Sequence, residues 1–318
     1  METLSQKQIQ HQYQGLEVQP MPLPIELVLH IITCVLPNPG SFLTRSNPIT
    51  KMLLSFTLVC FETYRLARRY LREHCIYIST SIHLSSILLS IPCSPGSELC
   101  KVPSLYLAPF KETIDDLPVA LWTRELLLYT SPTLRKLVID IPLRSLCAEE
   151  DRLDVRRILR DGFAQLERLE EFVSVQDDLF LDLARDSEKA FVWRQWPNLK
   201  RLALYRAEFS EEFWRNVGKM PTLNMLMLVR PIGLQEFCVK TKAFEQFPGG
   251  RSLNLFLVNA ENEAVLDIPA TGWKVADASK AMNIWRYDLA TSPIGRDVGE
   301  ACREWIKTKT MNNTLWCL

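Results

Sequence analysis

The stretch Pro197-Asn-Leu199-Lys-Arg-Leu202-Ala-Leu204 decides the fold, because the same P-x-L-x-x-L-x-L arrangement recurs from Pro132 and from Pro221. Shorter or looser copies, L-x-x-L-x-L, begin at residues 102 and 166, and the second of these slips to Phe172. The copies therefore start at 102, 134, 166, 199 and 223, with spacings of 32, 32, 33 and 24 residues. A near-constant spacing of this kind predicts a series of stacked structural repeats.

Each copy predicts a strand, and helical patterns fill the intervals. A sixth strand is expected at 253–257, and helices are expected at 117–129, 149–163, 179–193 and 210–217. Strands that alternate with helices form parallel sheets, because the helix carries the chain back to the same edge. The sequence predicts an α/β fold with one parallel sheet and with the helices on its outer face.

Composition narrows the class of protein. The chain has 318 residues, of which 47% are hydrophobic and 23% charged, and its 37 basic residues balance its 37 acidic residues. A net charge of zero gives no reason to expect nucleic acid or a membrane as a partner. The nine cysteines are scattered and odd in number, which favours reduced intracellular thiols. We expect a cytoplasmic or nuclear protein with a flexible tail over residues 1–20.

The segment before the repeats is helical. Pro24 and Glu26 suit the first turn of a helix that runs to Leu36, and apolar residues cover most of that helix. Such a helix should pack on its own core on one side and on a partner on the other. A second helical pattern follows from Ile49 to Glu73, with a break expected near 60–63, and a short strand is expected at 75–78.

This segment resembles the F-box, a helical motif of ubiquitin ligase subunits. The F-box begins with Leu-Pro, an acidic residue and Leu, followed by an Ile-Leu-like pair, and it continues with leucines, Val-Cys and an aromatic residue. The matching residues here are Leu23, Pro24, Glu26, Leu27, Ile31-Ile32, Leu53-Leu54, Val59-Cys60 and Tyr64. The resemblance implies docking on a Skp-family adaptor through Leu23, Pro24, Leu27, Ile31, Leu54 and Val59.

The repeat region resembles the leucine-rich repeats that often follow an F-box in fungal proteins of this length. The polar residue usual after each strand is missing, so the resemblance implies an irregular solenoid. It gives four parts: a tail at 1–20, an F-box-like domain at 21–75, a solenoid at 76–260 and a C-terminal cap at 261–318. One helix, at about 296–307, is expected in the cap.

We find no motif for catalysis or cofactor binding, and we predict that the chain is not an enzyme and holds no metal. His74, Cys75, His83, Cys93 and Cys100 have spacings that fit no common zinc site. Asp115-Asp116 and Asp177-Asp178 precede predicted helices, where capping explains them better than acid–base chemistry. The group Trp193, Trp196 and Trp214 is expected in the core rather than in a binding cleft.

Two surfaces remain candidates for binding. Alternation along the strands turns Tyr205, Met225, Met227 and Phe256 away from the helix side, and they are predicted to anchor a target protein. The alternative is that they pack against the C-terminal cap. Arg65, Arg68, Arg69 and Arg72 form a basic stripe on one helix. This stripe is either a solvated face or a contact for phosphate or an acidic protein.

The resemblances together imply a substrate-recognition subunit of an SCF-type ubiquitin ligase. The F-box would dock on the Skp-family adaptor and cullin assembly, and the repeats would hold a target protein. The alternative is a leucine-rich-repeat scaffold for protein interactions that acts outside ubiquitin ligation.

Overall fold

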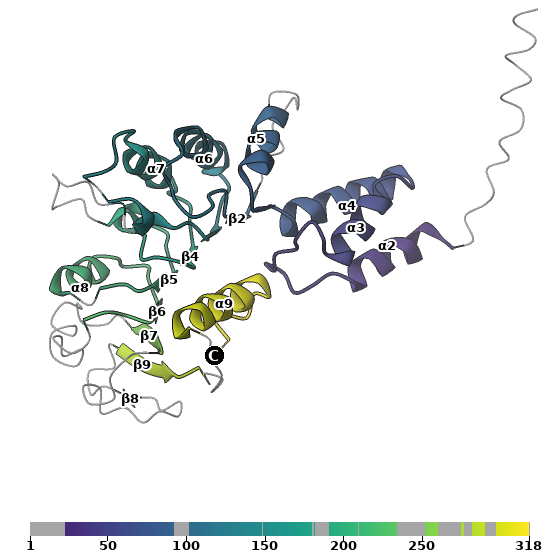
Figure 1. The fold of residues 1–318 in the computed structure, drawn as a ribbon. Coiled ribbons are helices and arrows are strands. Elements are labelled where there is room, and N and C mark those ends of the chain that lie inside the picture. Colours follow the sequence, from purple (N-terminus) through teal and green to yellow (C-terminus); the bar gives the residue numbers. More distant parts are fainter. Residues whose placement is uncertain are drawn as a thin grey trace, which may run out of the picture.

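The computed structural model describes residues 23–91, 102–147, 149–179, 181, 191–208, 210–233, 252–259, 275–276, 282–289 and 297–317. It shows an α/β protein in which three helices precede a parallel sheet and the helices that cover it (Figure 1). The predicted N-terminal tail lies outside the described residues.

The three N-terminal helices are α2 (Ile25–Cys34), α3 (Pro48–Phe56) and α4 (Phe61–His74). The pattern expected from Ile49 to Glu73 is thus two helices, and the break falls at 57–60, slightly earlier than predicted. Asn47 is the N-cap of α3, and its side-chain oxygen accepts a hydrogen bond from the backbone N–H of Ile49 at 2.9 Å. The helices enclose a small apolar core of their own, formed by Val28, Ile32, Leu53, Ala67 and Tyr70.

The sheet follows the chain strand by strand. Its strands are β1 (Tyr77–Ile78), β2 (Ser104–Leu107), β3 (Lys136–Ile139), β4 (Glu171–Ser174), β5 (Arg201–Tyr205), β6 (Met225–Val229), β7 (Leu253–Val258), β8 (Val275–Ala276) and β9 (Met282–Tyr287). They lie in the order β1-β2-β3-β4-β5-β6-β7-β9-β8, and every pairing is parallel except that between β8 and β9. The predicted parallel sheet is confirmed.

The backbone enters and leaves successive strands in the same way. The carbonyl of Lys200 accepts the N–H groups of Asn224 and Met225, as that of Glu170 accepts those of Lys200 and Arg201. At the other end, left-handed residues follow three strands: Arg206, Arg230 and Asn259. Each donates its N–H to the last residue of the next strand at 2.8–2.9 Å. This repeated bonding satisfies the backbone groups at both ends of the strands.

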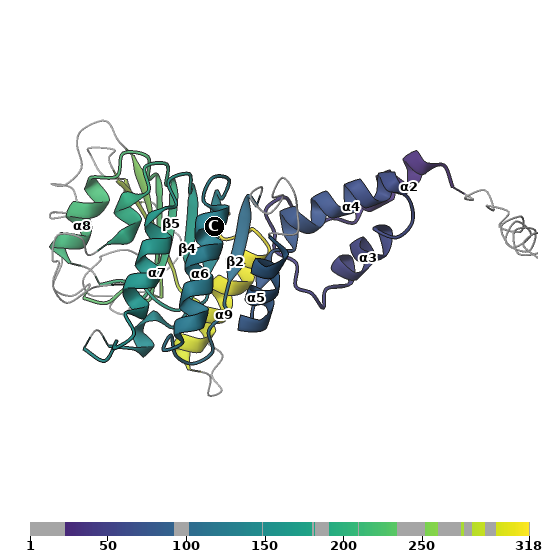
Figure 2. The same cartoon turned by 90° about the horizontal axis from the view of Figure 1, so that it is seen from above.

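Helices cover one face of the sheet (Figure 2). They are α5 (Ser81–Ser90), α6 (Leu117–Thr130), α7 (Val155–Ala164) and α8 (Glu211–Gly218), with 3₁₀ turns at Leu143–Ser145 and Val192–Gln195. Helix α7 starts later than the predicted residue 149, because both carboxylate oxygens of Asp151 accept backbone N–H groups of its first turn at 2.8 Å. The helix predicted at 179–193 lies mostly outside the described residues. Trp193, Trp196 and Trp214 are buried on this side, as expected.

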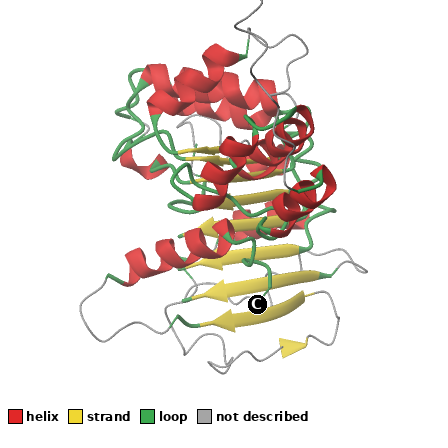
Figure 3. Ribbon diagram, turned by 90° about the vertical axis from the view of Figure 1, so that its right-hand side faces the viewer, coloured by secondary structure: helices red, strands yellow, loops and turns green. Residues whose placement is uncertain are grey.

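Helix α9 (Val298–Met311) lies against the other face of the sheet (Figure 3). A cap that only closes the last repeat was expected, but Cys302, Ile306 and Leu315 pack on side chains from β2 through β7. Strand β4 also departs from the expected register. Its Phe172, rather than Leu169, pairs with Leu137, so Glu171 and Val173 lie on the face covered by α9, where a strand that began at Leu166 would place Arg168 and Glu170.

Candidate protein-binding surface

Helix α2 carries an apolar stripe that faces solvent. Leu23, just before the helix, is 45% exposed, and Leu27 and Ile31 are 49% and 46% exposed. Val28 and Ile32, one position further along, are buried against α3 and α4. The sequence makes both faces of this helix apolar, and the three-helix core has room for only one of them.

A second group of exposed apolar side chains lies at the end of α3. Leu54 and Val59 are both 51% exposed. Leu58 in the connection to α4 is 87% exposed, and Phe61, the first residue of α4, is 66% exposed. Pro24 is exposed as well. All six residues predicted to contact an adaptor are therefore on the surface of one three-helix unit. We call these residues, together with Val35, Leu58 and Phe61, the apolar surface.

Sequence reasoning missed Val35, Leu58 and Phe61. Val35 is 39% exposed and follows Ile31 by four residues, so helical periodicity could have found it. Leu58 lies within the break between α3 and α4 and Phe61 directly follows it, and helical periodicity does not extend through a turn. A group of exposed apolar side chains of this kind is typical of a surface that a partner covers.

The predicted target-binding residues are covered by α9, and the prediction of an exposed anchor patch is wrong. Tyr205, Met227 and Phe256 are 3%, 0% and 7% exposed, and Met225 is partly buried in the same cluster. The hydroxyl of Tyr205 donates to the carbonyl of Gly299 in α9 at 3.3 Å. Alternation along the strands places these side chains on the predicted face, but α9 occupies it.

A serine at position 227 should therefore destabilise the fold. We expect Met227→Ser to lower the free energy of unfolding by about 3 kcal/mol, because it leaves a cavity and buries a hydroxyl. Met225→Ser is the matched comparison and should cost less, since Met225 is only partly buried. Urea denaturation followed by circular dichroism measures both, and equal stability of wild type and Met227→Ser would contradict the packing described here.

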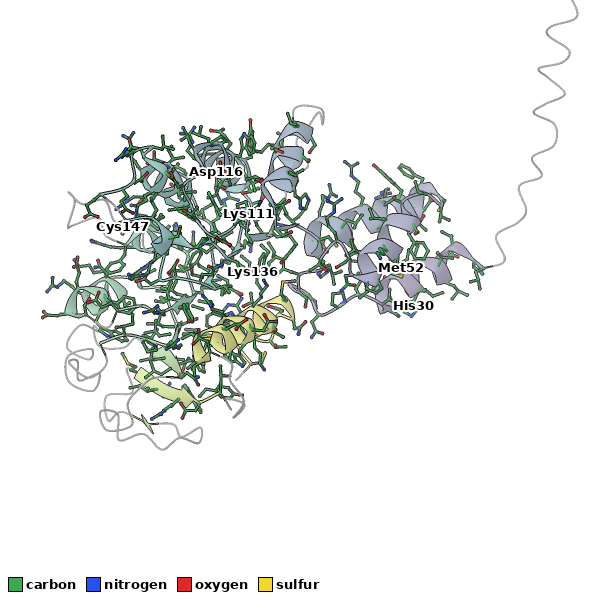
Figure 4. All side chains as sticks on the ribbon, viewed as in Figure 1. His30, Met52, Lys111, Asp116, Lys136 and Cys147 are labelled. Carbon is green, nitrogen blue, oxygen red and sulfur yellow. The ribbon has the colours of Figure 1, made fainter. Side chains whose placement is uncertain are left out.

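A buried ionic cluster joins the sheet, the first loop and the C-terminal segment. The Nζ atom of Lys136 lies 3.2 Å from Glu171, and it donates to the carbonyl of Gly40 at 3.1 Å and to the side chain of Asn313 at 2.7 Å. Arg201 reaches the second oxygen of Glu171 at 2.8 Å. Burial lowers the pKa of Lys136 from its ordinary value, and the neighbouring Glu171 opposes that shift. Figure 4 labels Lys136 beside α9.

The same junction has polar and aromatic contacts further along β2. The hydroxyl of Tyr106 donates to Asp140 at 2.9 Å, and Lys307 of α9 contacts the same carboxylate oxygen at 3.1 Å. The ring of Tyr106 stacks on Tyr77 at 4.5 Å and meets the edge of Phe42 at 5.9 Å. Burial raises the pKa of Tyr106, and the charge of Asp140 raises it further. These groups form a structural joint rather than an acid–base pair.

The acidic pairs of the sequence have structural partners. Asp116 caps α6 by accepting from the N–H of Val119 at 3.1 Å, as predicted (Figure 4). The second pair differs from the expected caps. Asp178 takes two hydrogen bonds from the guanidinium of Arg144, at 2.8 and 3.2 Å, and Asp177 accepts the Arg144 backbone N–H. Burial raises the pKa of both carboxyl groups.

The described parts of the chain contain neither a candidate metal site nor a candidate membrane span. No group of three or more His, Cys, Asp or Glu residues there could hold a metal ion. Cys93 and Cys100 belong to the group whose spacings fit no common zinc site, and they lie outside those parts. None of the helices that the structure describes combines the length and the apolar character needed to cross a membrane.

Comparison of the chain with models of protein families, with curated proteins and with solved structures finds no match.

Proposed function

We propose that the chain is a substrate-recognition subunit of an SCF-type ubiquitin ligase. The observation that carries the proposal is the exposure of Leu23, Pro24, Leu27, Ile31, Leu54 and Val59 on the three-helix unit. These residues are those that the F-box resemblance assigns to adaptor contact, and a folded unit that leaves them in water needs a partner. The partners would be a Skp-family adaptor, the cullin bound to it and a target protein.

We propose further that the sheet and its outer helices are degenerate leucine-rich repeats. Three facts support this: the strands follow one another in chain order, helices cover one face, and the same backbone hydrogen bonds recur between neighbouring strands. The helix α9 would then fill the inner face, so a target would contact residues other than Tyr205, Met227 and Phe256. The chain itself would do no chemistry, and its contribution would be to bring the target close to a charged ubiquitin carrier.

Affinity purification of the full chain tests the proposal. We expect the Skp-family adaptor and the cullin to co-purify with the wild-type chain, and a variant with Leu23→Ala and Pro24→Ala to lose both. Recovery of other proteins without adaptor or cullin would instead favour the interaction scaffold outside ubiquitin ligation. Full adaptor binding by the double variant would refute the assignment of the apolar surface.

A further inference from the structure

A groove with a volume of about 750 Å³ lies between α2 and α4. Leu29 and Thr33 line it from α2, and a row of residues from Glu62 to Arg72 lines it from α4. Leu29 and Thr33 each follow a residue of the apolar surface by two positions, which is about 200° around a helix. The groove therefore opens mainly on the side of α2 away from its exposed apolar stripe, and His30, three positions after Leu27, lies at the border between them.

The groove is strongly basic. Its lining includes the guanidinium groups of Arg65, Arg68, Arg69 and Arg72 and the single carboxylate of Glu62. Glu73, beside the groove, also lies 3.8 Å from Arg69, so four positive and two negative charges give a local excess of two, although the whole chain has a net charge of zero. A charge excess that is concentrated on one surface attracts anions to that surface.

Aromatic rings hold three of the arginines in place. The guanidinium of Arg65 lies over the ring of Phe61 at 5.9 Å, that of Arg68 over Tyr64 at 5.6 Å, and that of Arg69 over Tyr70 at 4.8 Å.

Arg68 and Arg69 also donate hydrogen bonds to the hydroxyl groups of Tyr64 and Tyr70, at 2.8 and 3.0 Å. An arginine that is already oriented loses less side-chain entropy when it binds an anion.

We propose that this groove binds a short anionic peptide segment through these arginines. A guanidinium matches carboxylate and phosphate oxygens with two parallel hydrogen bonds, so aspartate, glutamate or phosphoserine side chains would suit it. Arg65 and Arg72 are seven positions apart on α4, which is about 10 Å along the helix axis. That length matches about three residues of an extended peptide.

The distribution of charge favours a short peptide over a nucleic acid or a membrane. Outside the four arginines, Glu62 and Glu73, the chain has 33 basic and 35 acidic residues. The rest of the protein therefore offers no excess of positive charge with which a long polyanion or an anionic lipid surface could make further contacts. A short ligand needs no such contacts, because it binds the groove alone. The proposal does not depend on the ubiquitin ligase function.

Fluorescence anisotropy with labelled hexapeptides tests the inference on the full chain. One peptide is all glutamate, one alternates phosphoserine with glycine, and one is all glutamine. The groove variant is Arg65→Gln with Arg69→Gln, since both side chains are exposed. The control variant, Arg45→Gln with Lys51→Gln, removes two charges from exposed positions of the same three-helix unit outside the groove.

We expect the anionic peptides to bind the wild type and the glutamine peptide not to bind. The groove variant should bind about tenfold more weakly, and the control variant should change affinity less than about twofold. A further variant, Arg65→Lys with Arg69→Lys, keeps the charge but loses the paired hydrogen bonds, and should fall between wild type and the glutamine variant.

Three results would overturn the proposal: no binding of either anionic peptide, equal weakening in the groove and control variants, or tighter binding to vesicles of anionic phospholipid than to the peptides. Melting temperatures of all variants show whether they are folded. Adaptor co-purification with the single variant Arg69→Gln keeps the two proposals apart, because Arg69 contacts Tyr70 rather than the apolar surface and we expect co-purification to be unchanged.

Discussion

A chain with Leu27→Asp and Ile31→Asp should lose adaptor binding by more than about 100-fold while its melting temperature stays the same. Both side chains are nearly half exposed, so the new carboxylates remain in water in the free protein. Docking would remove them from water without a partner charge, which costs several kcal/mol. Titration of the purified adaptor by calorimetry measures the loss.

The matched control adds one aspartate to the groove side of the same helix. Thr33 is exposed, lines the groove and follows Ile31 by two positions, about 200° around the helix. We expect Thr33→Asp to leave adaptor affinity within about threefold of the wild type, whereas Ile31→Asp alone should weaken it by more than that. If both single variants lose binding equally, the adaptor contact does not lie where we propose.

The second large effect concerns stability. Glu171→Ala should lower the free energy of unfolding by about 3–5 kcal/mol, because it leaves the charge of Lys136 buried without its carboxylate. The side chains of Lys136 and Glu171 are 9% and 3% exposed, so water cannot replace the lost contact. Arg201 is 41% exposed and can turn to solvent. Urea denaturation measures the change.

Glu170 provides the control for this prediction. It is the neighbour of Glu171, and its side chain is 29% exposed and pairs with Arg135 and Lys200 on the surface. Glu170→Ala should cost less than about 1 kcal/mol. A chain with Lys136→Met and Glu171→Met together should be more stable than Glu171→Ala, because no buried charge is then left unpaired and Arg201 can turn to solvent. A single variant Glu171→Ala as stable as Glu170→Ala would contradict the burial of the cluster.

Patterns that are local in the chain predicted most of the fold. Leu202 and Leu204 pair with Leu226 and Leu228 in the expected parallel register, since helix α8 lies between these two strands in the chain and returns it to the same edge. The register of β4 was harder to predict, because Leu166, Leu169 and Phe172 are all apolar and buried, and each could be the first apolar residue of the strand. Local periodicity does not determine which of these apolar residues lies in the strand, whereas the pairing of Phe172 with Leu137 of β3 does.

Contacts between distant segments escaped prediction. Nothing near Met227 in the sequence shows that α9, some 70 positions later, covers it. Lys136 and Glu171 are ordinary charged residues in their own segments, and only the pairing of β3 with β4 makes them a buried pair. For the candidate site, the apolar surface was predictable because α2 has more apolar residues than one small core can bury.

The bonds of Asn313 have a consequence for the order in which the protein is assembled during translation. Its side chain donates to the carbonyl of Pro39 at 2.7 Å, across 274 positions of the chain, and it accepts from Lys136. A ribosome adds about 5–20 residues per second, so about 15–55 seconds pass between these two partners. During that interval the N-terminal helices can fold on their own core and Lys136 can reach the carbonyl of Gly40, but the bonds from Asn313 cannot yet form. A nascent chain would thus expose its apolar surface to chaperones before the C-terminal segment secures the first loop to the sheet.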